Sequence, residues 1–227
     1  MKTPSRHSKG RKPKAEQSVE KVRLAQCHAV VIGAGAIGRA VATLLASLGV
    51  RHMSLYDPAI VTRKNMAQGF MDCDVGMAKV DAVANIAHQQ NPRMELRMYR
   101  SRFRRTHLQK WSSGLKNAVF VCVDSMAARK SIWKQLKHDT QFLCDGRFGT
   151  EVIRVIASQQ PATDTDYPST LAVVPPSTYS CDLVTANIAA VFMVAQFSRW
   201  LRRRSVISDQ ILNLLAQEIT ILDGNYR

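Results

Sequence analysis

The amino-acid sequence predicts an α/β fold: a three-layer Rossmann-like domain with a mostly parallel sheet and C-terminal helices. Three observations support this prediction. Apolar runs of strand length alternate with segments of helical periodicity, the runs are rich in Val and Ile, and a glycine-rich turn follows the first run. Strands that are buried on both faces have this composition, and the alternation implies a parallel sheet that helices cover on both sides.

Six apolar runs are expected to form strands, at residues 29–32, 53–56, 118–123, 142–144, 152–157 and 171–174. The first helix is expected after the glycine turn, because apolar residues recur at helical spacing from Ile37 to Leu48, before Gly49 as a C-cap. A second helical face covers residues 77–87 and is ended by Asn91-Pro92. Further helices are expected at residues 126–137, 184–195 and 207–215.

The chain has 227 residues, 46% of them hydrophobic, which is enough for one sizeable α/β domain. Residues 1–17 are rich in Lys, Arg, Ser and Pro and are expected to be a disordered basic tail, so the single domain is expected to span residues 18–227. The most apolar helical stretch, residues 183–197, contains polar residues and is expected to be a buried helix, not a membrane span. The basic N-terminus lacks the apolar core of a secretory signal, so we expect a cytoplasmic protein.

Five cysteines are widely spaced, and none forms a C-x-x-C pair. We therefore expect no zinc site and mostly free thiols, with Cys122 in the core as the clearest case.

The net charge is +15, with a pI near 10.1. Besides the tail, a basic cluster is interleaved with Tyr99 and Phe103; it consists of Arg97, Arg100, Arg102, Arg104 and Arg105. The cluster could bind a nucleic acid, contact an acidic protein partner or simply face the solvent. Nucleic acid is not favoured, because no recognised binding motif accompanies the charge.

The first apolar run leads into a G-x-G-x-x-G turn formed by Gly33, Gly35 and Gly38. Gly33 permits the tight turn, Gly35 lets the backbone approach a phosphate, and Gly38 lets the helix pack against the strand. The following helix N-terminus offers amides to phosphates. Asp57, at the end of the next strand, is placed to accept ribose hydroxyls. This turn predicts nucleotide binding but does not distinguish NAD, FAD and ATP.

Motifs further along the chain narrow the choice among these nucleotides. They are Asn65, Gln68, Asp74-Val-Gly-Met-Ala-Lys79, Asn91-Pro92 and, after the third strand, Asp124-Ser-Met-Ala-Ala-Arg129. Over roughly residues 20–160 this pattern resembles the ThiF/MoeB-type adenylyltransferases, the family of the thiamine- and molybdopterin-pathway activating enzymes and the ubiquitin-activating enzymes. The resemblance implies that ATP and Mg²⁺ are used to adenylate the C-terminal carboxylate of a small ubiquitin-like or sulfur-carrier protein, and that the enzyme is a homodimer.

The resemblance also implies roles for individual residues. Lys79 would contact a phosphate, Asp124 would hold Mg²⁺ shared with the phosphates, and Asn65 and Gln68 would contact phosphates or ribose. Arg129 would belong to the same nucleotide site, bracing the loop that carries Asp124. Elementary chemistry agrees, because an ammonium group and a hard divalent cation both stabilise charge that develops on phosphoryl oxygens. Taken alone, Lys79 could be a solvated helix residue, Asp124 a helix N-cap and Arg129 a surface ion-pair partner.

The sequence departs from the family pattern at Ala67. In family members of the thiamine and molybdopterin type, this position, directly before the glutamine, is an arginine that is expected to contact the ATP phosphates. Arg63 or Lys64 could substitute for it. Cys181, just before a strong helix, is the candidate thiol acceptor, since a helix N-terminus favours the thiolate; a small buried residue is the alternative.

The turn Asp145-Gly-Arg147 either lines the same crevice or is bridged by its own charges. Two other functions stay open: an NAD(P)- or FAD-dependent oxidoreductase, and a catalytically silent module that keeps the fold. The oxidoreductase would leave Lys79 and Asp124 unexplained.

Overall fold

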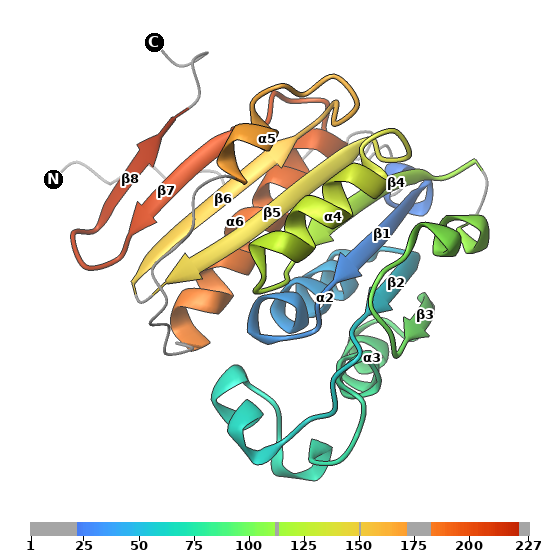
Figure 1. Cartoon of the computed structure of the whole chain (residues 1–227). Coiled ribbons are helices and arrows are strands. Elements are labelled where there is room, and N and C mark those ends of the chain that lie inside the picture. Colours follow the sequence, from blue (N-terminus) through green and yellow to red (C-terminus); the bar gives the residue numbers. More distant parts are fainter. Residues whose placement is uncertain (1–21, 112–113, 150, 172–182, 223–227) are drawn as a thin grey trace, which may run out of the picture.

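An eight-stranded sheet between two layers of helices forms the protein (Figure 1). The computed structural model describes residues 22–111, 114–149, 151–171 and 183–222. The strands are β1 (Cys27–Ile32), β2 (His52–Tyr56), β3 (Glu95–Tyr99), β4 (Lys116–Val121), β5 (Phe142–Gly149), β6 (Val152–Ser158), β7 (Asp209–Asn213) and β8 (Glu218–Ile221). The helices are α2 (Ala36–Leu48), α3 (Lys79–Gln90), α4 (Met126–Leu136), α5 (Tyr167–Thr170) and α6 (Leu183–Leu201), with short 3₁₀ turns η1 (Arg63–Gln68), η2 (Asp72–Asp74) and η3 (Arg105–Lys110).

The strand order is β3-β2-β1-β4-β5-β6-β7-β8. Neighbouring strands from β3 to β5 pair in parallel, and those from β5 to β8 pair antiparallel. The predicted α/β class with a mostly parallel sheet is confirmed. In the parallel half the carboxyl ends of the strands share one edge, which is where ligands bind in open α/β sheets.

Five of the expected strands are present as β1, β2, β4, β5 and β6, because each carries apolar residues buried on both faces. Strand β3 was not predicted, since as an edge strand most of its residues are exposed and it lacks an apolar run. Of the expected strand 171–174, Leu171 lies in a turn after α5 and the remainder lies outside the described residues. The basic tail also lies outside them.

The expectation of a helix at residues 207–215 is wrong, because this segment forms β7 and the turn to β8. Ile207, Ile211 and Leu215 recur every four residues and imitate a helical face. Burial instead alternates, with Gln210 and Leu212 buried between more exposed neighbours, which is the period of a strand. Pairing with β6 satisfies the backbone of β7, a long-range contact that local spacing does not reveal.

Two hydrophobic clusters fill the layers. One lies under α2, α3 and α6, and the other lies under α4 and α5 on the opposite face (Figure 1). Among the described residues, α6 is the one helix long and apolar enough to cross a membrane. Its small residues Ala186, Ala189 and Ala190 are buried against α2 and β5, so α6 is a core helix of the domain, as its polar interruptions predict.

His28 on β1 makes stability depend on pH. Its buried ring is hydrogen bonded to Ser54 Oγ at 2.9 Å and Asn117 Oδ1 at 3.2 Å. Burial lowers the pKa of His28 from 6.5 to about 4, so the unfolded chain takes up this proton first as the pH falls.

We therefore expect the His28 contribution to be intact above pH 6.5 and lost as the pH falls through 4, by roughly 3 kcal/mol of unfolding free energy. Urea unfolding of wild type and His28→Gln between pH 4 and 7 checks this. The wild type should lose more stability than the variant on acidification. Parallel pH profiles would contradict the expectation.

Candidate nucleotide-binding crevice

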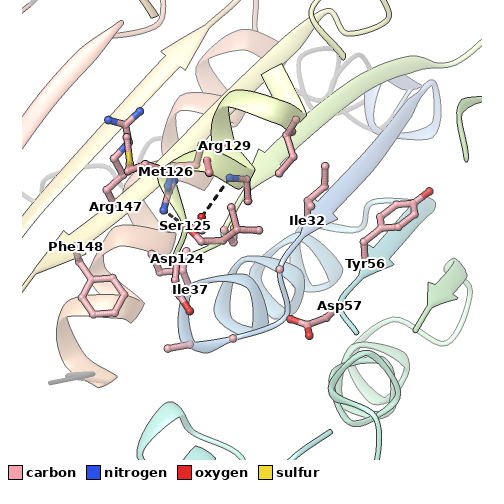
Figure 2. Close-up of a pocket in the computed structure, with 18 of the residues that line it drawn as sticks. Ile32, Ile37, Tyr56, Asp57, Asp124, Ser125, Met126, Arg129, Arg147 and Phe148 are labelled. Carbon is pink, nitrogen blue, oxygen red and sulfur yellow. Dashed lines mark hydrogen bonds between the residues drawn. The ribbon is translucent and has the colours of Figure 1, made fainter. Parts of the chain in front are cut away.

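A crevice of about 1500 Å³ lies at the carboxyl ends of the parallel strands (Figure 2). The glycine turn after β1, Asp57 after β2, Asp124 after β4 and Arg147 near the end of β5 contribute to its wall. Its volume exceeds that of most small-ligand sites. The crevice therefore has room for a nucleotide together with part of a second substrate.

The three glycines of the turn have different surroundings. Gly33 has a φ of +98°, and a Cβ there would collide with the carbonyl of Cys122. A Cβ on Gly38 would collide with the carbonyl of Gly33, so both glycines are required for packing. Gly35 differs, because the nearest atom to its Cβ would be Gln68 Oε1 at 3.9 Å. Gly35 therefore faces the crevice, at the start of α2, where main-chain amides lack intrahelical partners.

This difference predicts opposite effects of alanine at two positions. Gly38→Ala should lower the unfolding free energy by about 2 kcal/mol or more, because the methyl group meets backbone that cannot move aside. Gly35→Ala should leave stability nearly unchanged, since its φ of −77° suits alanine, while weakening nucleotide binding. Chemical denaturation and ATP titration of both variants separate the two effects. Equal destabilisation by both would refute this division of roles.

Asp57 holds the glycine turn in place. Its Oδ2 accepts a hydrogen bond from the Ala34 amide and its Oδ1 accepts one from the Ala59 amide, both at 2.8 Å. The side chain is half-buried and lines the crevice (Figure 2). Each oxygen keeps a lone pair for a further donor. The geometry is compatible with the predicted contact to ribose hydroxyls.

Three predicted residues converge on one amide group. Gln68 Oε1 accepts hydrogen bonds from Lys79 Nζ and from Asn65 Nδ2, each at 3.2 Å. Gln68 and Lys79 line the crevice, whereas Asn65 lies behind Gln68 and positions it. Lys79 is the first residue of α3, so the helix begins two residues later than the helical face expected from residue 77. The helix starts later because Met77 and Ala78 belong to a bridged loop.

Arg39 was not predicted and supports this group from α2. Its Nε donates to the Gln68 carbonyl at 3.2 Å, and its guanidinium occupies the space that a Cβ on Gly69 would need. Burial lowers the pKa of Arg39 from its ordinary value, although the group stays charged at neutral pH. Arg39 therefore fixes the turn that presents Gln68 to the crevice.

Asp124 extends into the crevice as an exposed carboxylate. It is not the N-cap of α4, because Ser125 takes that position and its Oγ accepts from the Ala128 amide at 3.3 Å. The described residues include no group of three His, Cys, Asp or Glu side chains that could hold a metal ion. A lone carboxylate fits Mg²⁺ that takes its remaining ligands from phosphates and water.

Arg129 braces the end of β4. Its guanidinium is buried, forms an ion pair with the fully buried Asp145, and donates to the carbonyls of Val123 and Gly146. Burial and repulsion from Arg147 lower the pKa of Arg129 to about 10, so it remains protonated at neutral pH. The contact with Val123, next to Asp124, supports the bracing role expected for Arg129.

The turn after Asp145 both lines the crevice and is bridged by its own charges. Arg147 Nη2 lies 2.7 Å from Asp145 Oδ2, which also accepts a 3.0 Å hydrogen bond from the Tyr167 hydroxyl. Arg147 further donates to the Thr170 carbonyl at 2.9 Å. These bonds tie α5 to β5 on the wall of the crevice.

Several lining residues were missed by sequence reasoning. They include Tyr56, Phe103, Phe148 and Arg154, together with Arg102 as the single member of the basic cluster that reaches the crevice. The strand-end position of Tyr56, directly before Asp57, was the available signal. Ala67, Arg63 and Lys64 are exposed and are not among the lining residues. Cys181 lies outside the described residues.

A family model described as the ThiF family matches residues 13–214, which is most of the chain. The chain belongs to the ThiF family. No curated protein matches. Among solved structures, PaaA is similar with a TM-score of 0.73 and 18% identity over 89% of this chain and 65% of that one.

E. coli MccB is also similar to this ThiF-family chain. Its structure with ATP gives a TM-score of 0.69 at 16% identity, and its structure with MccA gives 0.71 at 16%; each covers 89% of this chain and 65% of the other. At such identity these likenesses show the fold. The chain spans 65% of the length of the proteins that it resembles.

Proposed function

We propose that the protein binds ATP in the crevice and adenylates a C-terminal carboxylate of a peptide or small carrier protein. The observation that carries this proposal is that a cation, Lys79, and a carboxylate, Asp124, line the same crevice as the glycine turn. Gln68 orients the Lys79 ammonium group, and the Asp124 carboxylate is not occupied in capping α4. Hydride transfer by a dinucleotide-dependent oxidoreductase does not require this cation and carboxylate.

The reaction follows from in-line displacement at phosphorus. A carboxylate oxygen of the substrate attacks the α-phosphorus of ATP, the bond from that phosphorus to the bridging oxygen breaks, and pyrophosphate leaves. The acyl adenylate keeps the new bond between carboxyl oxygen and phosphorus. Lys79 and the amides at the start of α2 stabilise the negative charge on the phosphoryl oxygens.

Asp124 would hold Mg²⁺, which would neutralise charge on the phosphates when bound. Asp57 would fix the ribose, and the Arg129 brace would keep Asp124 at the end of β4. Catalysis would then consist mainly of positioning and electrostatic stabilisation, which needs no further nucleophile from the protein for the first step.

The finer proposal is that the substrate is a small ubiquitin-like or sulfur-carrier protein. A chain of charge +15 favours an acidic partner, because complementary charge speeds association. One of the similar structures contains MccB together with MccA, which supports a separate protein or peptide as the second substrate. We further propose a cytoplasmic homodimer as the working form.

Pyrophosphate–ATP exchange tests the function. The protein is incubated with ATP, Mg²⁺, labelled pyrophosphate and a panel of carrier proteins and peptides, alongside Asp124→Asn and the matched control Lys64→Ala, an exposed cation outside the crevice. Substrate-dependent exchange that Asp124→Asn abolishes and Lys64→Ala keeps is the expected result. ATP binding without exchange on any substrate would favour a silent binding module instead.

A further inference from the structure

A second hollow lies at the opposite edge of the sheet from the crevice. We call it the basal pocket; its volume is about 360 Å³, which is the size of a small-molecule site. The starts of β1 and β4 and the turn after α6 contribute to its wall. Four of its lining residues are cations, namely Arg23, Lys116, Arg203 and Arg204, and none of its lining residues in the described part of the chain is acidic.

The rest of the wall does not offset this charge. Its other polar members are uncharged, namely Gln26, Gln159, Gln160 and Ser205, and Trp200 adds an aromatic ring. Cys27 is buried at the pocket, and burial raises the pKa of its thiol to about 12, so it carries no negative charge at neutral pH. The pocket therefore presents positive charge together with hydrogen-bonding amides.

The C-terminal end of a helix would ordinarily repel an anion, and α6 ends beside this pocket. Its last carbonyls, however, are already occupied. Leu201 O accepts from Arg23 Nη1 at 2.6 Å, and the carbonyls of Trp200 and Arg199 accept from the next turn's backbone amides at 2.9 Å. The negative end of the helix is thus covered by donors from the chain itself.

The turn after α6 places an arginine where glycine is favoured. Arg203 N bonds to Trp200 O and Arg204 N bonds to Arg199 O, which is the pattern of a Schellman motif with Arg203 at the left-handed position. Its φ is +56°, and left-handed backbone is costly for a residue with a Cβ. Within the part of the chain that the structure describes, the Arg203 side chain forms no ion pair that would offset this cost.

We propose that the basal pocket is a binding site for a small phosphate-bearing ligand, held by Arg203, Arg204 and Lys116. Guanidinium groups bind phosphate oxygens through paired N–H donors, and a lysine adds a point charge. Arg203 lines the pocket from its left-handed position, and phosphate binding would account for an arginine at a place that favours glycine. This site is independent of the adenylation proposed for the crevice.

Calorimetric titration with inorganic phosphate, against chloride at equal ionic strength, tests the proposal. The proteins are wild type, Arg203→Gly, Lys116→Ala, the crevice variant Lys79→Ala and the matched surface control Arg51→Ala. We expect saturable binding that Arg203→Gly and Lys116→Ala weaken by at least about tenfold and that the other two retain. Arg203→Gly should also raise the melting temperature of the free protein, since glycine suits the left-handed position, which separates lost binding from lost folding.

Other outcomes would overturn the proposal. One is the absence of saturable phosphate binding, and another is equal weakening by Arg51→Ala. A third is loss of binding in Lys79→Ala together with retained binding in Arg203→Gly, because this result would assign the phosphate to the crevice.

A parallel titration with a short oligonucleotide tests whether the bound phosphate belongs to a nucleic acid instead of a small molecule. Binding of the oligonucleotide that Arg51→Ala weakens as much as Arg203→Gly would show recognition of surface charge, not of the pocket. Because none of these readouts involves ATP turnover, failure here leaves the proposed function untouched.

Discussion

Replacing Asp145 by alanine should lower the free energy of unfolding by about 3–5 kcal/mol, the largest stability effect that we expect in this chain. Asp145 is fully buried and pairs with both Arg129 and Arg147. Removing the carboxylate leaves the buried Arg129 guanidinium with only the Val123 and Gly146 carbonyls as partners. Burial and its neighbour Arg147 already disfavour the charged form of Arg129, so an unpaired charge there is costly.

Urea unfolding of Asp145→Ala measures this loss, with Glu95→Ala as the control. Glu95 pairs with His52 at 3.2 Å on the surface, and its removal should cost less than about 1 kcal/mol. The double variant Arg129→Met with Asp145→Leu should recover part of the stability, because it removes the unpaired charge of Arg129, while Arg147 keeps its bond to the Thr170 carbonyl. A double variant as unstable as Asp145→Ala would argue against this explanation.

Replacing Lys79 by alanine should lower the rate of adenylation by about 10² to 10³, as removal of one preorganised transition-state donor does in other enzymes. The reason is that Lys79 provides the cation that the Gln68 amide holds at the crevice wall. Stability should change little, since the lost bond to Gln68 lies at the surface of the crevice and Asn65 still donates to Gln68.

Initial rates of substrate-dependent pyrophosphate exchange check this expectation, and Lys64→Ala again serves as the matched cation. Lys79→Gln should be as defective as Lys79→Ala, because it retains a hydrogen-bond donor but not the charge. Wild-type exchange in Lys79→Gln would mean that hydrogen bonding alone is sufficient and that the charge has no catalytic role.

Local signals made the core of the fold predictable. Strands β1 and β4 are apolar runs buried on both faces, and the turn at Gly33 and Gly38 is fixed by contacts within a few residues or with the adjacent strand. The third layer and the parallel order follow from the strand–helix alternation. Such features are predictable because each depends on short-range sequence patterns.

Contacts between distant segments were not predictable in the same way. The apolar residues of the β7 segment fit the spacing of a helix as well as that of a strand. Only the pairing with β6 decides which of the two forms. Arg154 forms two hydrogen bonds to Asp209, at 3.0 Å and 2.6 Å, across 55 residues and between two strands of which one was expected to be a helix. No local pattern identifies such a pair.

The residues of the candidate site likewise fall into those that sequence motifs identify and those that only three-dimensional contacts reveal. Lys79, Gln68 and Asn65 were selected by their place in the motifs, and the structure brings them together. Arg39 and Tyr56 were missed because their roles depend on what the turn after η1 and the end of β2 contact in three dimensions. Tyr56 stacks on Tyr99 with ring centroids 4.4 Å apart, so an aromatic floor forms beside the crevice from strands that are separated by a helix.

Nucleotide binding, measured by isothermal titration calorimetry, tests the assignment of the crevice to ATP without depending on the identity of the second substrate. ATP with Mg²⁺ and, separately, NAD⁺ are titrated into wild type, Gly35→Ala and Lys79→Ala. We predict saturable ATP binding by wild type, weaker binding by both variants, and no saturable NAD⁺ binding. Saturable NAD⁺ binding without ATP binding would contradict the assignment.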